Sequence, residues 1–169
     1  NEALIKKYAE KLSISFERVE YAKNNFIRVV KVMKAFILND SVKSFLCLNN
    51  KLPQENKGLF DIKLLEEFAD AIIKLYGIKG LKGKDLLYSI NSEDYDAKRA
   101  EFIQRLSKGE KLFVISSYNT VGAGQNLQYK APGNATIVAV NDYDRGDMEK
   151  DFDCIYLEKP TNLLVNVDS

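Results

Sequence analysis

The chain alternates short apolar runs with longer stretches of helical periodicity, and this pattern limits the folds open to it. Five runs of five to seven residues have the composition of buried strands, namely Val42–Leu48, Asp85–Ile90, Lys111–Ser117, Ala135–Val140 and Asp153–Leu157. Stretches with apolar residues at three- and four-residue steps separate the first three runs. This order is typical of an α/β fold, in which helices cover both faces of a parallel sheet.

The first 39 residues are predicted to be helical. Ser15 is a suitable N-cap, and one apolar stripe follows it, formed by Phe16, Val19, Phe26, Val30, Met33 and Ile37. Residues 1–36 contain eight Lys and Arg against four Glu. A solvated helix face is the ordinary explanation for such an excess, and a phosphate-binding face is the alternative.

Two further helices are expected between the strands. The first is capped by Asp61 and ends at Gly77, with Leu64, Leu65, Phe68, Ile72 and Leu75 as its apolar positions. The second is capped by Ser92 and ends at Gly109, with Phe102, Ile103 and Leu106 facing inward. We therefore divide the chain into a helical extension, residues 1–40, and an α/β domain, residues 41–169.

The amino-acid composition excludes several kinds of catalysis and metal binding. The 169 residues include 25 basic, 24 acidic and no histidine residues, which excludes Ser-His-Asp and Cys-His catalysis and His-ligated zinc within this chain. Cys47 and Cys154 are far apart and lie in apolar runs, so we expect two reduced core thiols. No run approaches 18 apolar residues, and no secretory signal opens the chain. We expect a soluble, cytoplasmic protein with no membrane partner.

Polar residues concentrate after the strongest predicted strand. The segment SSYNTVGAGQNLQ, residues 116–128, follows it directly. In open α/β sheets, ligands bind beyond the carboxyl ends of the strands. The segment fits neither the dinucleotide pattern G-x-G-x-x-G nor the phosphate loop G-x-x-x-x-G-K-[ST], and no phosphate-loop lysine occurs in the chain. A complete nucleotide hydrolase is therefore not expected here.

The stretch LFVISSYNTVGAGQNLQ resembles motif V of superfamily-two helicases and translocases, where a strand runs into a Ser/Thr-rich turn and then into G-x-G-x-N-L. Upstream, SFLCLNN is similar to the first strand of the second motor lobe, and Arg99 is similar to an arginine early in a following helix. Downstream, DFDCIYLEKPTN is similar to the segment before motif VI. The resemblance covers residues 42–163, and only the motif V stretch is specific.

The resemblance implies a three-layer RecA-like sheet that forms the second lobe of an ATP-driven nucleic-acid motor. By position, the phosphate-side candidates are Ser116, Ser117 and Thr120, and the nucleotide-side candidates are Gly122, Gly124, Asn126 and Gln128. The implied partners are the first RecA-like lobe and DNA or RNA, and the implied cofactors of the whole motor are ATP and Mg²⁺. No metal ligand or catalytic residue is assigned in this chain.

The chain departs from the motor pattern because Walker A, motif II and motif VI are missing. Only Arg145 among the five arginines follows motif V, and its acidic surroundings do not match the arginine finger of motif VI. We therefore expect a lobe that is inactive alone. A non-catalytic α/β interaction module, docking a partner through its N-terminal helices, is the alternative. A small acid–base enzyme is a third reading, and no local constellation supports it.

Overall fold

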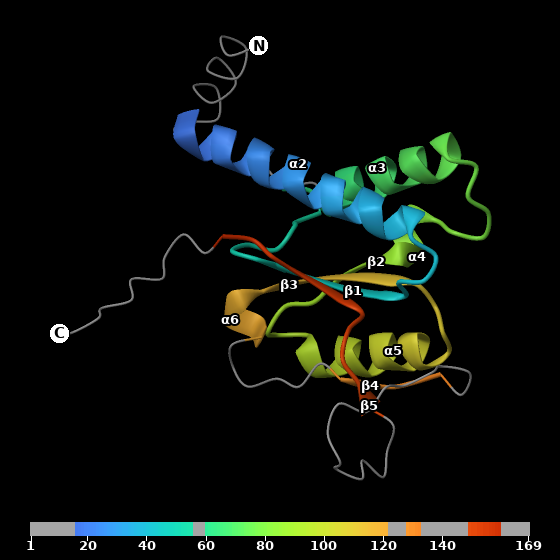
Figure 1. Ribbon diagram of the computed structural model, residues 1–169. Helices are drawn as coiled ribbons and strands as arrows, with labels where there is room; N and C mark the ends of the chain where they lie inside the picture. Colours follow the sequence, from blue (N-terminus) through green and yellow to red (C-terminus); the bar gives the residue numbers. More distant parts are fainter. Residues whose placement is uncertain (1–15, 56–59, 122–127, 133–148, 160–169) are drawn as a thin grey trace, which may run out of the picture. The chain divides into compact units, whose positions relative to one another are not determined.

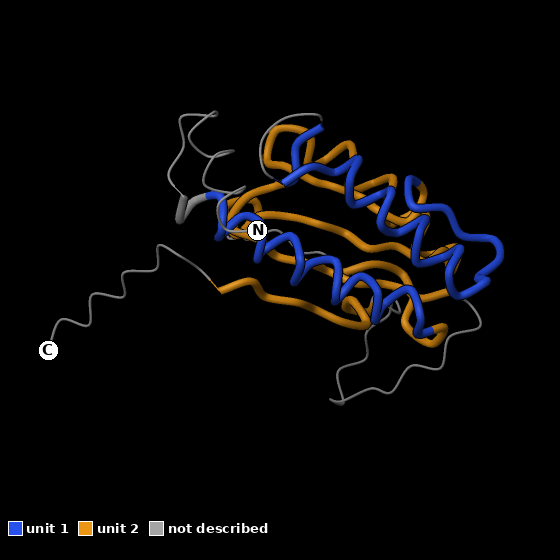
Figure 2. Tube along the Cα trace, turned by 90° about the horizontal axis from the view of Figure 1, so that it is seen from above, with its two compact units in different colours: residues 1–39, 53–84 blue, residues 40–52, 85–169 orange. Residues whose placement is uncertain are grey.

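A computed structural model describes residues 16–55, 60–121, 128–132 and 149–159 (Figure 1). The chain divides into two compact units, and each is made of two separate segments (Figure 2). Unit 1 comprises residues 1–39 and 53–84, and unit 2 comprises residues 40–52 and 85–169. The domain boundary expected at residues 40–41 stays a prediction.

The described part of unit 1 contains the helices α2 (Phe16–Leu38) and α3 (Ile62–Leu75), which pack side by side. The ring of Phe26 on α2 meets Phe60 and Phe68 edge-on, with centroids 6.2 and 5.5 Å away. Asp61 caps α3, because its carboxylate accepts a hydrogen bond from the Lys63 N–H at 2.8 Å. Gly77, with φ +65°, adopts the left-handed conformation that commonly ends a helix.

The predicted α3 cap and end are confirmed, but the apolar stripes are only partly right. On α3 the buried residues are Leu65, Ala69, Ile72 and Ile73, whereas Leu64, Phe68 and Leu75 are exposed. On α2 the buried apolar residues are Val19, Val29, Met33, Phe36 and Ile37. Steps of three and four fit neighbouring positions almost equally well, so periodicity did not separate Val29 from Val30. The predicted Ser15 cap lies outside the described residues.

Unit 2 is built on a four-stranded sheet in the order β2-β3-β1-β6, with every neighbouring pair parallel. The strands are β1 (Ser44–Asn49), β2 (Leu87–Ser89), β3 (Leu112–Ser117) and β6 (Cys154–Leu157). The β1–β3 register pairs Leu48 with Ser116 and Asn49 with Ser117. A short antiparallel pair, β4 (Tyr129–Lys130) and β5 (Glu149–Lys150), lies apart from this sheet.

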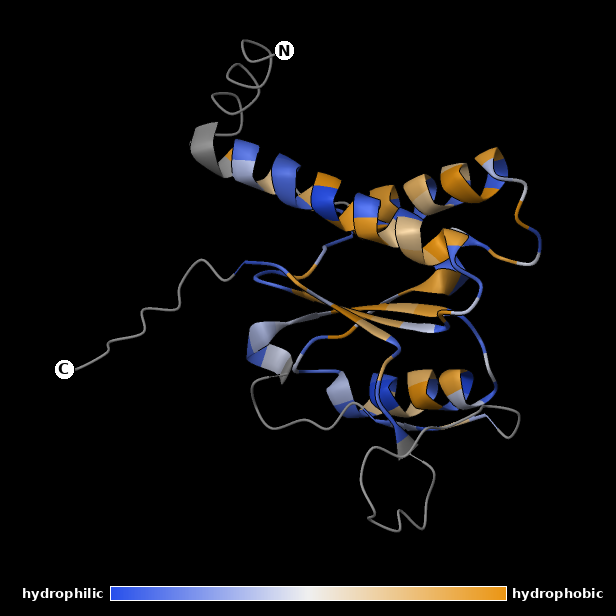
Figure 3. Ribbon diagram, in the orientation of Figure 1, coloured by the Kyte–Doolittle hydropathy of each residue, from blue (hydrophilic) through white to orange (hydrophobic). Residues whose placement is uncertain are grey.

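Three helices accompany the strands in chain order: α4 (Gly83–Leu86), α5 (Tyr95–Ser107) and α6 (Tyr118–Val121). Helix α5 lies across one face of the sheet (Figure 1). Its Phe102 and Leu106 are completely buried in one apolar cluster with Leu46, Leu48, Leu112 and Val114 of the strands. The strands are accordingly largely hydrophobic in Figure 3. Tyr129 and Phe152 complete this cluster, so the β4 segment packs against α5.

The α/β class is confirmed, because an all-parallel four-stranded sheet alternates with helices and follows an N-terminal helix, which is consistent with a RecA-like fold. The second strand is shorter than predicted, because Asp85 and Leu86 belong to α4. The cap predicted at Ser92 is wrong. The Asn91 side chain accepts from the N–H groups of Glu93 and Asp94, and this turn delays the helix until Tyr95. The strand predicted at 135–140 lies outside the described residues.

No helix in the described part of the chain is long and apolar enough to cross a membrane.

Candidate functional site

The carboxyl ends of the four parallel strands meet at one edge of the unit 2 sheet. Each strand ends in, or is directly followed by, polar residues at this edge. β1 ends at Asn49, β3 ends at Ser117, β2 ends at Ser89, and β6 is followed by Glu158. This carboxyl edge is therefore the candidate site, and the motif V-like segment begins there because it continues directly from the end of β3.

Three predicted phosphate-side residues lie together at the end of β3. Ser117 Oγ and Thr120 Oγ1 are 2.9 Å apart and hydrogen-bonded, and the Thr120 N–H donates to Ser117 Oγ at 3.3 Å. Ser116 Oγ donates to the Ile90 carbonyl at 3.2 Å and is 1% exposed. Ser117 and Thr120 thus form one hydroxyl pair, while Ser116 is committed to the neighbouring strand end.

Of the four predicted nucleotide-side residues, the structure describes only Gln128. Gly122, Gly124 and Asn126 lie outside the described residues. Gln128 donates through Nε2 to the Asp151 carboxylate at 2.8 Å. Asp151 precedes β6, so the structure places Gln128 near the amino end of that strand rather than with Ser117.

Packing of the next residue accounts for the position of Gln128. Tyr129 is buried, its ring meets Phe152 edge-on at 6.0 Å, and its hydroxyl bonds Ser44 Oγ at 2.8 Å. Ser44 begins β1 and Phe152 lies two residues before the start of β6, so both lie towards the amino edge of the sheet. The buried aromatic ring therefore draws this part of the chain to the opposite edge.

Two buried residues at the carboxyl edge were not singled out from sequence. Glu158 is 2% exposed, and its carboxylate accepts from the Tyr156 hydroxyl at 2.9 Å. Asn49 is fully buried, and its Oδ1 accepts no hydrogen bond from any described residue. Each is a polar residue at the end of an apolar run, which is the signal that could have identified both from the sequence.

The hydrogen bond of Tyr118 links the end of β3 to the segment after β6. Its hydroxyl donates to the Glu158 carbonyl at 2.5 Å, and the Glu158 N–H donates to the Leu48 carbonyl at 2.9 Å. Asn50 adds a bond from Nδ2 to the Lys159 carbonyl at 2.8 Å. These bonds hold the ends of β1, β3 and β6 together at this edge. The described role of Tyr118 is therefore to connect the end of β3 to the segment after β6.

Cys47 lies two residues before Asn49 on β1, and its thiol is kept protonated. Burial raises the pKa of the Cys47 thiol to about 12, and the Glu158 carboxylate adds to the effect. A protonated thiol is a poor nucleophile and a poor metal ligand. Within the described ranges, no group of three or more Cys, Asp or Glu side chains is arranged to hold a metal ion. The edge offers hydroxyl, amide and carboxylate groups for hydrogen bonding.

Neither a protein-family model nor a curated protein sequence matches this chain.

Proposed function

We propose that this chain is the second motor lobe of a larger helicase-like, ATP-dependent nucleic-acid translocase and is inactive alone. The proposal rests mainly on one observation. The segment that resembles motif V directly follows β3, which has strands on both sides, and its first hydroxyl pair lies at the carboxyl edge. That edge is where open α/β sheets bind their ligands.

Ser117 and Thr120 are the proposed contacts to nucleic-acid phosphate. When two hydroxyls share one hydrogen bond, one hydrogen is used between them and the other stays available as a donor. A phosphate oxygen next to this pair would receive that second hydrogen. Ser116 is less suited to the role, because its hydrogen already goes to the Ile90 carbonyl.

The nucleotide-side role belongs, in this proposal, to Gly122, Gly124 and Asn126. The sequence contains no phosphate-loop lysine, so this chain does not fit the phosphates of ATP alone. ATP and Mg²⁺ would bind the first lobe of the complete motor and supply the phosphoryl-transfer chemistry. The residues of this chain would then position nucleic acid and close the nucleotide site from one side.

An interaction module is the second candidate function, and one feature favours it. Among the described strands, β6 is the last in the sheet order, and its Ile155 and Leu157 are 57% and 61% exposed. Exposed apolar residues on an edge strand are typical of surfaces that pair with another chain. This function predicts protein binding at β6 and no affinity for nucleic acid at the end of β3.

The proposal is tested by removing the hydroxyl pair. In fluorescence anisotropy with labelled single-stranded DNA and RNA oligonucleotides, Ser117→Ala combined with Thr120→Val is expected to weaken binding by about tenfold. A lost hydrogen bond to a charged group is worth about 1.5–3 kcal/mol. Thr120→Ser keeps both hydroxyls and is expected to retain the affinity, which separates loss of contact from loss of packing.

Unchanged affinity in the double variant, with its fold intact by circular dichroism, would contradict the phosphate role of the edge. Hydrolysis of ATP by the isolated chain would contradict the assignment as a second lobe, because the sequence lacks a phosphate loop.

A further inference from the structure

Positive charge is concentrated in two stretches of unit 1. Residues 21–38 and 71–84 contain eight basic residues and no acidic one, namely Lys23, Arg28, Lys31, Lys34, Lys74, Lys79, Lys82 and Lys84. The whole chain has 25 basic and 24 acidic residues, so the remaining sequence has 17 and 24 and a net charge of −7. The near-neutral net charge of the whole chain thus conceals two strongly basic stretches of unit 1.

The packing of unit 1 brings the two stretches together. Phe26 on α2 contacts Phe68 on α3. Eight residues further along each chain segment, Lys34 Nζ lies 5.2 Å from the ring centroid of Tyr76. Equal steps on both helices mean that α2 and α3 run parallel, and their carboxyl-terminal ends lie side by side (Figures 1 and 2). Lys34 of α2 and the end of α3, where the lysine-bearing segment begins, therefore share one end of unit 1.

The segment after α3 is held in a defined shape by its glycines. The Ile78 N–H donates to the Ile73 carbonyl at 3.0 Å beside the left-handed Gly77, and Gly80 has φ +80°. Its far end is anchored where the Gly83 N–H donates to Asp70 Oδ1 at 2.6 Å. A Cβ on Gly83 would lie 2.3 Å from the Glu66 carbonyl oxygen, so only glycine fits this contact. The lysine loop, residues 74–84, is thus pinned to α3 at both ends.

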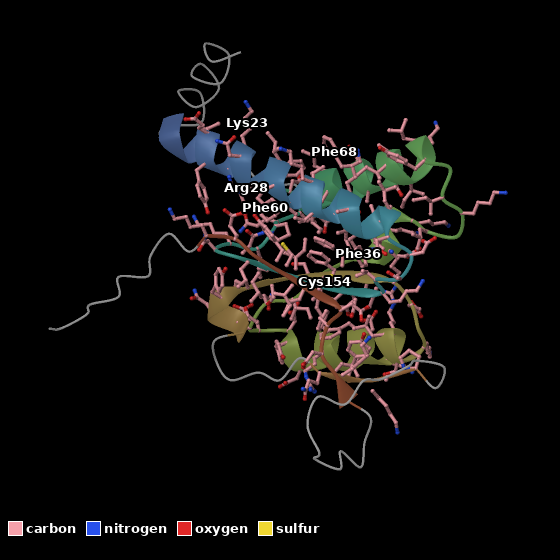
Figure 4. The ribbon with its side chains drawn as sticks, in the orientation of Figure 1. Lys23, Arg28, Phe36, Phe60, Phe68 and Cys154 are labelled. Atoms are coloured by element: carbon pink, nitrogen blue, oxygen red, sulfur yellow. The ribbon has the colours of Figure 1, made fainter. Side chains whose placement is uncertain are left out.

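The lysines of this end are exposed and are not paired with carboxylates. The exposed ones are Lys31, Lys34, Lys74, Lys79, Lys82 and Lys84, together with Lys23, which lies in the amino-terminal half of α2 and projects from that helix in Figure 4. Among the described residues none of these seven lysines forms an ion pair. The Asp70 carboxylate lies nearby, and it is engaged by the Gly83 N–H. Their charge is therefore available to an external anion.

An aromatic ring lies within this charged surface. Tyr76 caps α3 and remains 47% exposed, beside Lys34 and between Lys74 and Lys79 in the chain. An exposed ring among lysines is the combination with which proteins bind single strands, because bases stack on the ring while lysines follow the phosphates. A lipid surface would instead require a broad apolar face. Among the large hydrophobic residues described in unit 1, Leu75, at 78%, is the one that is more than half exposed.

We propose that the carboxyl-terminal ends of α2 and α3, together with the lysine loop, form a binding surface for single-stranded nucleic acid. Lys31, Lys34, Lys79 and Lys82 contact phosphates, and Tyr76 stacks on a base. All residues of this surface belong to unit 1, and the hydroxyl pair at the end of β3 is not one of its components. The proposed surface therefore stands whether or not the carboxyl edge of unit 2 binds nucleic acid.

The test compares two variants of the full chain that lose the same charge. Lys79→Gln with Lys82→Gln removes two loop lysines, and the control Lys108→Gln with Lys130→Gln removes two exposed lysines of unit 2. Binding of a fluorescent oligo-dT 20-mer is measured by anisotropy from 50 to 200 mM NaCl. The loop variant is expected to lower the slope of log K against log salt by about 1.4, since each single-strand phosphate contact contributes about 0.7. The control is expected to keep the full slope.

A third variant, Tyr76→Ala, is expected to weaken binding about tenfold or more while leaving the salt slope unchanged, because stacking is not ionic. Equal slopes for the loop variant and its control would overturn the proposal. Loop-dependent binding to phosphatidylserine vesicles without binding to oligo-dT would overturn it in favour of a lipid surface. Because Ser117 and Thr120 are intact in all these variants, the result is distinct from the test of the carboxyl edge.

Discussion

Cys47 and Cys154 occupy adjacent strands but have different surroundings. Cys47 is fully buried within β1, whereas Cys154 at the start of β6 is partly exposed. The raised pKa of Cys47 also has a consequence for stability. Above pH 9 the unfolded chain loses the thiol proton, while the folded chain keeps it up to about pH 12. The contribution of Cys47 to the free energy of unfolding is therefore present below pH 9 and is lost as the pH rises from 9 to about 12.

Alkylation at pH 8 is expected to distinguish the two thiols. Iodoacetamide should modify Cys154 in the folded chain and leave Cys47 intact, because a cysteine reacts only when its thiol is ionised and accessible to the reagent. Mass spectrometry of tryptic peptides measures this directly. In guanidinium chloride both cysteines should react, and a Cys47 that reacts as fast as Cys154 in the folded chain would contradict the burial described.

Gly83 is the residue whose substitution should most disturb the lysine loop. Gly83→Ala is expected to cost about 1–3 kcal/mol in the free energy of unfolding, since its methyl group would overlap the Glu66 carbonyl oxygen. Urea denaturation measures the loss. Gly80→Asn is the matched control, because no atom lies within 4 Å of a Cβ there and asparagine tolerates a positive φ. Equal stability of Gly83→Ala and the wild type would show that the loop is not anchored at this point.

At the scale of elements, one carboxylate joins the starts of β1 and β6. Asp153 Oδ2 accepts from the N–H groups of Lys43 and Ser44 at 2.8 and 3.0 Å, and Lys150 Nζ pairs with Oδ1. Burial raises the pKa of this carboxyl, but the bonds from Lys150, Ser44 and Lys43 outweigh burial and hold it below 3.8. This stabilisation is present above pH 4 and is lost as the pH falls below it.

Asp153→Asn is expected to lower the free energy of unfolding at pH 7 by about 1–3 kcal/mol, because two backbone donors lose a charged acceptor. The variant should also lose less stability than the wild type between pH 4 and pH 2. Asp151→Asn changes an exposed carboxylate and is expected to alter stability by no more than about 0.5 kcal/mol. Similar urea midpoints for the two variants would contradict the proposed role of Asp153 in joining the starts of β1 and β6.

Elements with strong local signals were predictable, and those placed by tertiary packing were not. The Asp61 cap and the Gly77 end of α3 follow from side-chain and backbone preferences of single residues, so the sequence sufficed. Strands β4 and β5 are two residues long and leave no periodic pattern. The position of Gln128 depends on Tyr129 reaching the core of unit 2, which the motif alone does not contain.

At the scale of the whole molecule, both compact units are discontinuous in sequence. Residues 53–84 join the N-terminal helix in unit 1, although they lie between β1 and β2 in the chain. The helical periodicity of residues 1–39 gives way to a strand-like apolar run at residue 42, so the sequence alone predicts a boundary near residue 40 instead. The same discontinuity conceals the basic surface, because its two halves are separated by more than 30 residues and meet only through the packing of α2 and α3.

The central claim is that the carboxyl edge of the unit 2 sheet binds nucleic acid. The most direct measurement is a titration of the ¹⁵N-labelled chain with a 12-nucleotide single strand, followed by amide chemical shifts. The account predicts salt-sensitive shifts at Asn49, Ser117, Tyr118 and Thr120, which persist in the Lys79→Gln/Lys82→Gln variant. Shifts that spare these four amides while the oligonucleotide binds elsewhere would contradict the claim.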